Sequence, residues 1–149
     1  MSPSPSRLET GARPREAGTE GAVGANKHGL LLFAHGARDA GWAAPFEAVA
    51  AQVRAASPAT PLALAYLEFM APDLVGAGTL LADAGCTAID VVPLFLGAGG
   101  HVRKDVPALL QRLRGMRPQL AVTLRDAIGA DPRVVDAMAQ AVLRPAASR

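Results

Sequence analysis

The chain has 149 residues, 50% of them apolar, which is enough for one domain with a sizeable core. The formal net charge of +2 is small, and no basic stripe interleaved with aromatic residues is present, so composition argues against a nucleic-acid-binding function. No run approaches the ~18 apolar residues of a membrane span, and the single cysteine, Cys86, favours a reducing, cytoplasmic location.

Residues 1–27 are rich in Ser, Pro, Gly, Arg and Glu and contain almost no large apolar side chain. Such a segment cannot bury enough surface to offset the entropy lost on ordering it, so we expect a disordered tail. Residues 28–149 are expected to form one folded domain, because strand-like and helix-like patterns alternate from His28 onward.

The first half of this domain predicts two strands and two helices. A continuous apolar run over 29–34 is typical of a strand buried on both faces, and residues 43–56 carry apolar side chains at helical spacing. A second strand is expected over 62–69. The next helix is expected over 72–85 with Pro72 in its first turn, although two glycines inside it are unfavourable.

The second half repeats this alternation. A strand is expected over 88–96, a helix over 102–114, a short strand over 120–124 and a last helix over 132–143. Four strand–helix units predict an α/β fold, a four-stranded parallel sheet flanked by helices in the flavodoxin-like, doubly wound manner. Right-handed crossovers favour the strand order 2-1-3-4.

Two histidines occupy matching positions after the first and third strands. His35 begins the loop His-Gly-Ala-Arg-Asp, and His101 ends the loop Gly-Ala-Gly-Gly-His. In the order 2-1-3-4 both loops flank the crevice at the carboxyl ends of the strands, where ligands bind in open α/β sheets. Either histidine alone is as easily structural. Because imidazole binds transition metals and transfers protons, the pair predicts metal or proton chemistry in this crevice.

Other polar and glycine residues are expected at the same edge. Glu68 ends the second predicted strand, and a carboxylate there is costly unless it is paired or lies in a cleft. The loop containing Gly99 and Gly100 lacks the spacing of GxGxxG and GxxxxGK[ST], so it leaves room for a bulky ligand more readily than it cradles a phosphate.

Three cations and one aromatic residue complete the candidate set. Arg103 and Lys104 lie in the first turn of the third helix, where positive charge opposes the helix dipole. Either both side chains are simply solvated at the surface, or they raise the positive potential around a site for an anionic ligand. Arg38 would add to that potential. Phe95 belongs to the core or meets a flat ligand.

Three motifs contain most of these residues: His35-Gly36-x-Arg38, Leu67-Glu68-Phe69-x-x-Pro72, and Pro-Leu-Phe-Leu-x-x-Gly-x-His-x-x-x-Asp-x-Pro over 93–107. Through these motifs the chain resembles the small class II chelatases, specifically the short sirohydrochlorin cobaltochelatase type. The resemblance covers roughly residues 29–143. The family usually has Ser after the His-Gly pair, where this chain has Ala37.

The resemblance implies a chelatase-like fold and an enzyme that inserts a divalent metal into sirohydrochlorin or a related tetrapyrrole. Co²⁺ is expected first, with Fe²⁺ or Ni²⁺ as alternatives. The resemblance further implies a homodimer. In it, His35 and His101 would bind the metal and Glu68 would be the active-site acidic residue. We expect no permanently bound cofactor, since the metal is a substrate. The carboxylate-rich macrocycle suits contacts with Arg38, Phe95, Gly99, Gly100, Arg103 and Lys104.

Two alternatives to an enzyme were weighed. A non-catalytic tetrapyrrole or metal carrier would use the same crevice. A receiver-type or flavodoxin-like signalling domain would need an acidic cluster or a flavin loop after the first strand, and the segment from His35 to Arg38 is neither.

Overall fold

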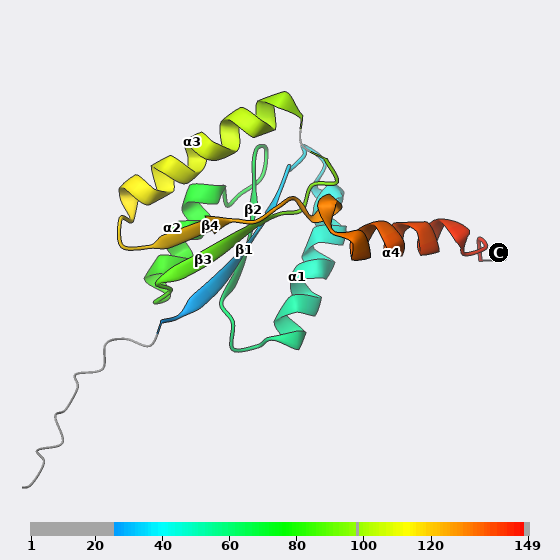
Figure 1. Ribbon diagram of the computed structural model, residues 1–149, viewed down its shortest axis with the longest axis horizontal. Coiled ribbons are helices and arrows are strands. Elements are labelled where there is room, and N and C mark those ends of the chain that lie inside the picture. The colour runs from blue at the N-terminus through cyan, green and yellow to red at the C-terminus, as the bar shows by residue number, and fades with distance from the viewer. Residues whose placement is uncertain (1–25, 98, 148–149) are drawn as a thin grey trace, which may run out of the picture.

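Residues 26–97 and 99–147 are described by a computed structural model, in which they build one four-stranded parallel sheet (Figure 1). Its strands are β1 (His28–Ala34), β2 (Leu62–Tyr66), β3 (Ala88–Pro93) and β4 (Ala121–Leu124). They lie in the order β2-β1-β3-β4, and every pairing is parallel. The strand order predicted from right-handed crossovers is therefore confirmed.

Helices alternate with the strands as the sequence predicts. They are α1 (Ala44–Ala56), α2 (Leu74–Asp83), α3 (Gly100–Met116) and α4 (Pro132–Leu143), with short 3-10 helices η1 (Ala40–Ala43) and η2 (Ile128–Ala130). Figure 1 shows α2 and α3 on one side of the sheet and α1 on the other. In the ranges that the structure describes, no helix is both long and apolar enough to span a bilayer.

The main core lies between the sheet and the α2–α3 layer. Leu31, Phe33, Ile89 and Val91 are fully buried there. Gly78 of α2 faces Leu113 of α3, and a Cβ on this glycine would lie 2.5 Å from Leu113 Cδ2. The glycine that lowers helix propensity therefore allows the two helices to approach closely.

The opposite face of the sheet is covered only in part. Helix α1 packs mainly against β2, where Leu32, Ala50 and Val92 form a small buried cluster. Helix α4 does not cover the remainder, because it extends away from the sheet (Figure 1). The structure describes α4 in full, and none of its residues is buried.

The loop after β2 differs from the prediction at two points. The strand ends at Tyr66 and not at residue 69, because Phe69 adopts a φ of +63°, which is incompatible with a strand. Pro72 lies outside α2, whose N-cap is Asp73, with its carboxylate accepting the Gly76 N–H at 2.7 Å. The Tyr66 N–H donates to Pro72 O at 2.9 Å, which closes the loop 67–72.

The beginning of the fold includes Lys27, which the sequence assigns to the tail. Its carbonyl oxygen accepts the Thr87 N–H at 2.9 Å, and its ammonium donates to Ala84 O at 3.0 Å. Residues 1–25 of the expected tail lie outside the described residues.

Candidate active site

The loop after β1 and the loop after β2 are joined by backbone hydrogen bonds. The Leu67 N–H donates to Ala34 O at 2.9 Å, and the Glu68 N–H donates to His35 O at 3.1 Å. Gly36 has a φ of +81°, and a Cβ there would overlap the carbonyl oxygen of Glu68. Glycine at this position therefore lets the His35 and Glu68 loops adjoin at the carboxyl edge of the sheet.

The ring of His35 packs against a buried aromatic pair. Its centroid lies 4.6 Å from that of Phe95, which in turn lies 5.7 Å from Phe33. Phe95 is only 4% exposed. Phe95 thus lies in the core, one of the two places that the sequence allows for it, and its ring packs against the imidazole. Its contact with a flat ligand stays a prediction.

Arg38 and Phe69 bring the tips of the same two loops together. The Arg38 guanidinium carbon lies 4.8 Å from the centre of the Phe69 ring, a cation–π arrangement. Phe69 is 58% exposed, and Glu68 beside it is also exposed. Glu68 lies two residues beyond the end of β2, on the loop and not on the strand as predicted, so its carboxylate reaches solvent.

The loop after β3 leads into α3. Gly99 is the N-cap of this helix, and the Arg103 N–H donates to Gly99 O at 3.2 Å. His101 belongs to the first turn, but its side chain lies outside the described part, so its place beside His35 stays a prediction. A Cβ on Gly100 would meet nothing within 4 Å, in agreement with a loop that leaves room for a ligand.

The first turn of α3 carries two positively charged side chains. Arg103 and Lys104 are both exposed. Among the described side chains, no three His, Cys, Asp or Glu residues converge on one point.

Cys86 is buried in the core near Ile89 and is a free thiol. Burial raises the pKa of the Cys86 thiol, so it is a packing residue and a weak nucleophile.

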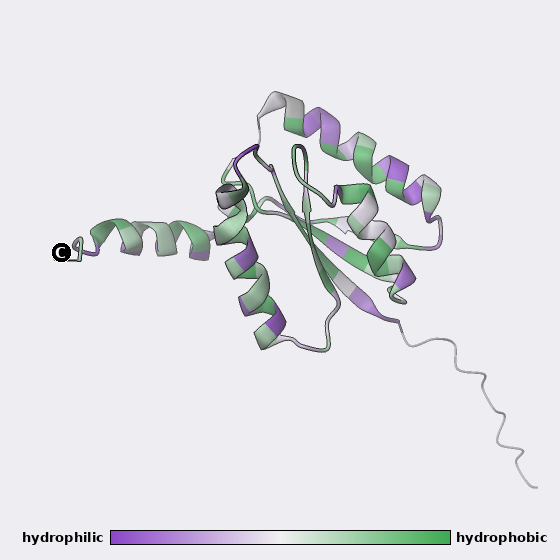
Figure 2. Cartoon of the chain, turned by 180° about the vertical axis from the view of Figure 1, so that it is seen from behind, coloured by the Kyte–Doolittle hydropathy of each residue, from purple (hydrophilic) through white to green (hydrophobic). Residues whose placement is uncertain are grey.

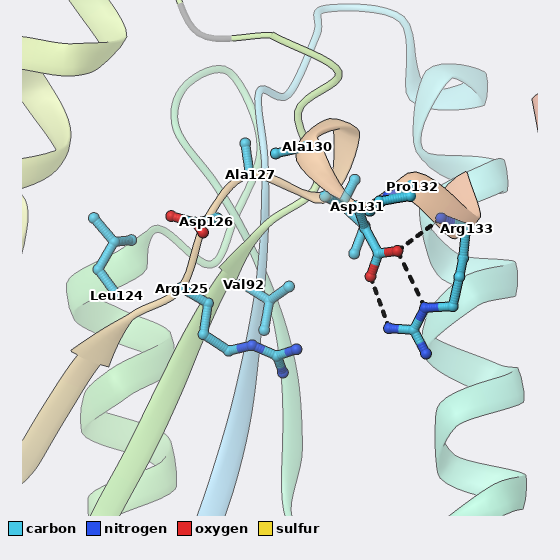
Figure 3. Close-up of a pocket in the computed structure, with 10 residues that line it drawn as sticks. Val92, Leu124, Arg125, Asp126, Ala127, Ala130, Asp131, Pro132 and Arg133 are labelled. Atoms are coloured by element: carbon cyan, nitrogen blue, oxygen red, sulfur yellow. Dashed lines mark hydrogen bonds and ion pairs between the residues drawn. The ribbon is translucent and has the colours of Figure 1, made fainter. Parts of the chain in front are cut away.

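The sequence reasoning missed a polar hollow beyond β4 (Figure 3). Its cavity volume is about 740 Å³, and Arg125, Asp126, Asp131 and Arg133 contribute its charged side chains. Hydrogen bonds from Arg133 hold the pKa of Asp131 at about 2. Arg125 also lines an adjoining cavity of about 280 Å³ together with Arg103. The signal was available: Arg125 and Asp126 directly follow the fourth apolar run, at the same edge as His35.

The sheet therefore has an imidazole, a carboxylate and several cations at its carboxyl edge, which is the edge where open α/β sheets bind their ligands. The family model described as CbiX matches residues 29–144, so the chain belongs to the CbiX family. The resemblance to the short chelatases, drawn from three motifs, is confirmed at the level of the family.

One curated relative and two solved structures illustrate the relationship. The sirohydrochlorin cobaltochelatase of Sulfurisphaera tokodaii is 32% identical over 77 residues, which are 52% of this chain and 61% of that protein. The chain thus spans about three fifths of that relative's length.

Both solved structures share the fold with a TM-score of 0.70. The putative cobalamin biosynthesis CbiX protein of Marinobacter aquaeolei is 36% identical, and the match covers 77% of this chain and 93% of that one. The sirohydrochlorin chelatase SirB of Bacillus subtilis, solved with cobalt, is 26% identical, and the match covers 78% of this chain but 50% of that one. The present domain therefore corresponds in size to half of the SirB chain.

Proposed function

We propose that this protein inserts a divalent metal ion into sirohydrochlorin or a closely related tetrapyrrole, and that it acts as a homodimer. The observation that carries the proposal is the joining of the His35 and Glu68 loops at the carboxyl edge of the sheet, in a chain of the CbiX family. Co²⁺ is the first candidate metal, with Fe²⁺ and Ni²⁺ as alternatives, because imidazole and carboxylate accept all three.

The reaction exchanges two pyrrole N–H protons of the macrocycle for one M²⁺ ion and releases the water bound to the metal. His35 and His101 bind the incoming metal through neutral imidazole nitrogens. Two imidazoles hold it less tightly than a closed four-ligand structural site, so it can pass to the macrocycle. Glu68, an exposed carboxylate on the loop that adjoins His35, accepts the two pyrrole protons one after the other and releases each to solvent.

Substrate binding relies on charge and on space. Arg38, Arg103 and Lys104 are exposed cations that attract the carboxylates of the macrocycle. Gly99 and Gly100 leave room where the macrocycle meets the loop after β3. Phe95 acts indirectly, by holding the ring of His35.

The test is an anaerobic optical assay of metal-free sirohydrochlorin with Co²⁺, Fe²⁺ and Ni²⁺, each with and without the protein. We expect the spectrum of the metallated macrocycle to appear faster than in the protein-free control, through many turnovers. Binding in a fixed ratio without turnover for all three metals would contradict the proposal and favour a carrier. A cytoplasmic location and the absence of a resident cofactor remain predictions.

A further inference from the structure

An apolar groove lies on the face of the sheet that α1 leaves partly open. Its cavity volume is about 590 Å³. The sheet contributes Leu30, Leu32, Val92 and Leu94, and α1 contributes Val49 and Val53. Val49 is 42% exposed although it faces this groove. Doubly wound sheets carry helices on both faces, and α1 alone does not cover this one, so the groove is sheet surface that a further helix could cover.

Helix α4 has the pattern of a helix that packs on such a groove. Counted from Val134, the residues one, four, seven and eight positions later are apolar too, which gives a wide apolar stripe along the helix. The stripe consists of Val134, Val135, Met138, Ala141 and Val142. Arg133, Asp136, Gln140 and Arg144 form the opposite, polar stripe. Val135, Met138 and Val142 are 55%, 48% and 84% exposed, and Figure 2 shows the helix largely hydrophobic and extended from the domain.

Helix α4 also needs a packing partner. Isolated helices shorter than about 12 to 15 residues are marginal in water, and α4 has 12 residues. Within the described part of the chain, its main contact is with η2, directly before it. The helix therefore lacks, in a single copy, the apolar surface that its pattern requires.

The direction in which α4 leaves the domain is fixed by its neighbour η2. The Gly129 N–H donates to Phe95 O at 2.9 Å, and a Cβ on Gly129 would overlap the backbone of Leu96. The carboxylate of Asp131 then caps α4 at the Arg133 N–H at 2.8 Å. Val134 at the start of α4 borders the groove of its own chain. For the rest of α4 to lie in that groove, this close contact of η2 with the loop after β3 would have to break.

We propose that α4 of a second copy of this chain fills the groove, and that the exchange is reciprocal in a two-fold dimer. A chain that carries both a groove and the projecting helix that matches it is typical of exchange between identical copies. Ile128 and Val134 line both the groove and the flank of α4, so the apolar surface is continuous from one to the other. This inference specifies the pairing in the proposed function and rests on that part of it.

Cross-linking between single-cysteine chains tests the exchange directly. In a Cys86→Ala background, one chain carries Met138→Cys on α4, and a second, differently tagged chain carries Val49→Cys on α1. After the two chains are refolded together and mildly oxidised, we expect a disulfide-linked heterodimer. The matched control replaces Met138→Cys by Gln140→Cys, on the polar stripe, and should link far less. Equal linking in both pairs, or none in either, would overturn the proposal.

A second pair of variants measures the strength of the contact. Met138→Asp would place a charge in the apolar groove, and we expect the dimer Kd to rise by about a hundredfold. Gln140→Asp should leave it unchanged, and circular dichroism should show both variants folded. A wild-type chain that is monomeric at micromolar concentration in light scattering would reject the inference. A cross-linked dimer that metallates no tetrapyrrole would reject the proposed activity and leave the exchange standing.

Discussion

At the scale of single residues, the position of His35 is fixed from two directions. Its carbonyl oxygen is bound by the Glu68 N–H, and its ring rests on that of Phe95. In the proposed reaction, such support would hold the side chain near its productive position before the ligand arrives, and so reduce the entropy lost when metal and macrocycle meet. Phe95, which belongs to the motif over 93–107, supports this ring from the core.

Replacing either proposed metal-binding histidine by Ala should nearly abolish metallation. Both act on the same encounter, so the double variant should be little worse than each single one. The measurement is the initial rate of metallation, with circular dichroism as the check on folding. A tenfold lower rate corresponds to a barrier only about 1.4 kcal/mol higher. If the folded double variant kept more than about a tenth of the wild-type rate, His35 and His101 would not have these roles.

Arg103→Ala and Lys104→Ala should raise KM for the tetrapyrrole and leave kcat nearly unchanged. Their proposed attraction for carboxylates acts equally in the ground and transition states, and it should fade as salt is added. The matched control is Arg112→Ala, an exposed cation on the same helix but away from the sheet edge. An equal effect of all three variants on KM would point to general charge and not to this site.

At the scale of elements, the α2–α3 contact depends on one missing side chain. Gly78→Ala should lower the free energy of unfolding by about 1–3 kcal/mol, because the new methyl would collide with Leu113, which is fully buried and has nowhere to move. Gly115→Ala in α3 is the control: a Cβ there meets nothing within 4 Å, so we expect stabilisation by about 0.5–1 kcal/mol. Urea unfolding of both variants makes the comparison.

The α2 cap offers a second test at this scale. Asp73→Ala removes the carboxylate that accepts the Gly76 N–H, and we expect a loss of about 1 kcal/mol in stability. Asp73→Asn retains an acceptor oxygen and should lose less. Thermal unfolding of the two variants distinguishes them, and equal losses would show that the cap bond contributes nothing.

The elements themselves were largely predictable, and the deviations have physical causes. Alternating strand-like and helix-like patterns predicted all four strands, and the helix predicted over 132–143 agrees with α4 (Pro132–Leu143). The second strand was predicted too long because Leu67 and Phe69 continue its apolar pattern. The pattern does not reveal that the chain turns back at Tyr66, where the bond to Pro72 closes the loop.

At the scale of the whole molecule, the start of the fold can be tested by truncation. Removal of residues 1–25 should leave the melting temperature nearly unchanged, as their composition provides no core residue. Removal of residues 1–27 should lower it, because the bonds from Lys27 to Thr87 and Ala84 are lost. A large decrease with the shorter truncation would show that the first residues contribute to the fold.

The candidate site and the relation between copies were less predictable than the fold. Strand order predicted that the loops of His35 and Glu68 lie at one edge. Arg125 stands outside the three motifs, and its place in the hollow beyond β4 depends on how η2 and the start of α4 pack there. Periodicity predicts that α4 has an apolar side. It says nothing of which surface that side meets, because this depends on the direction that Gly129 and η2 impose.

The chain contains one tryptophan, and its place has a practical consequence. Trp42 lies in η1, seven positions after His35, partly buried and with its ring centroid 4.6 Å from that of Phe46. Tetrapyrroles absorb light at the wavelengths where indole emits, so a macrocycle at the carboxyl edge would quench this fluorescence by energy transfer. The unmodified protein thus has an optical reporter of occupancy, which can be recorded separately from the change in the macrocycle's own absorption that accompanies metallation.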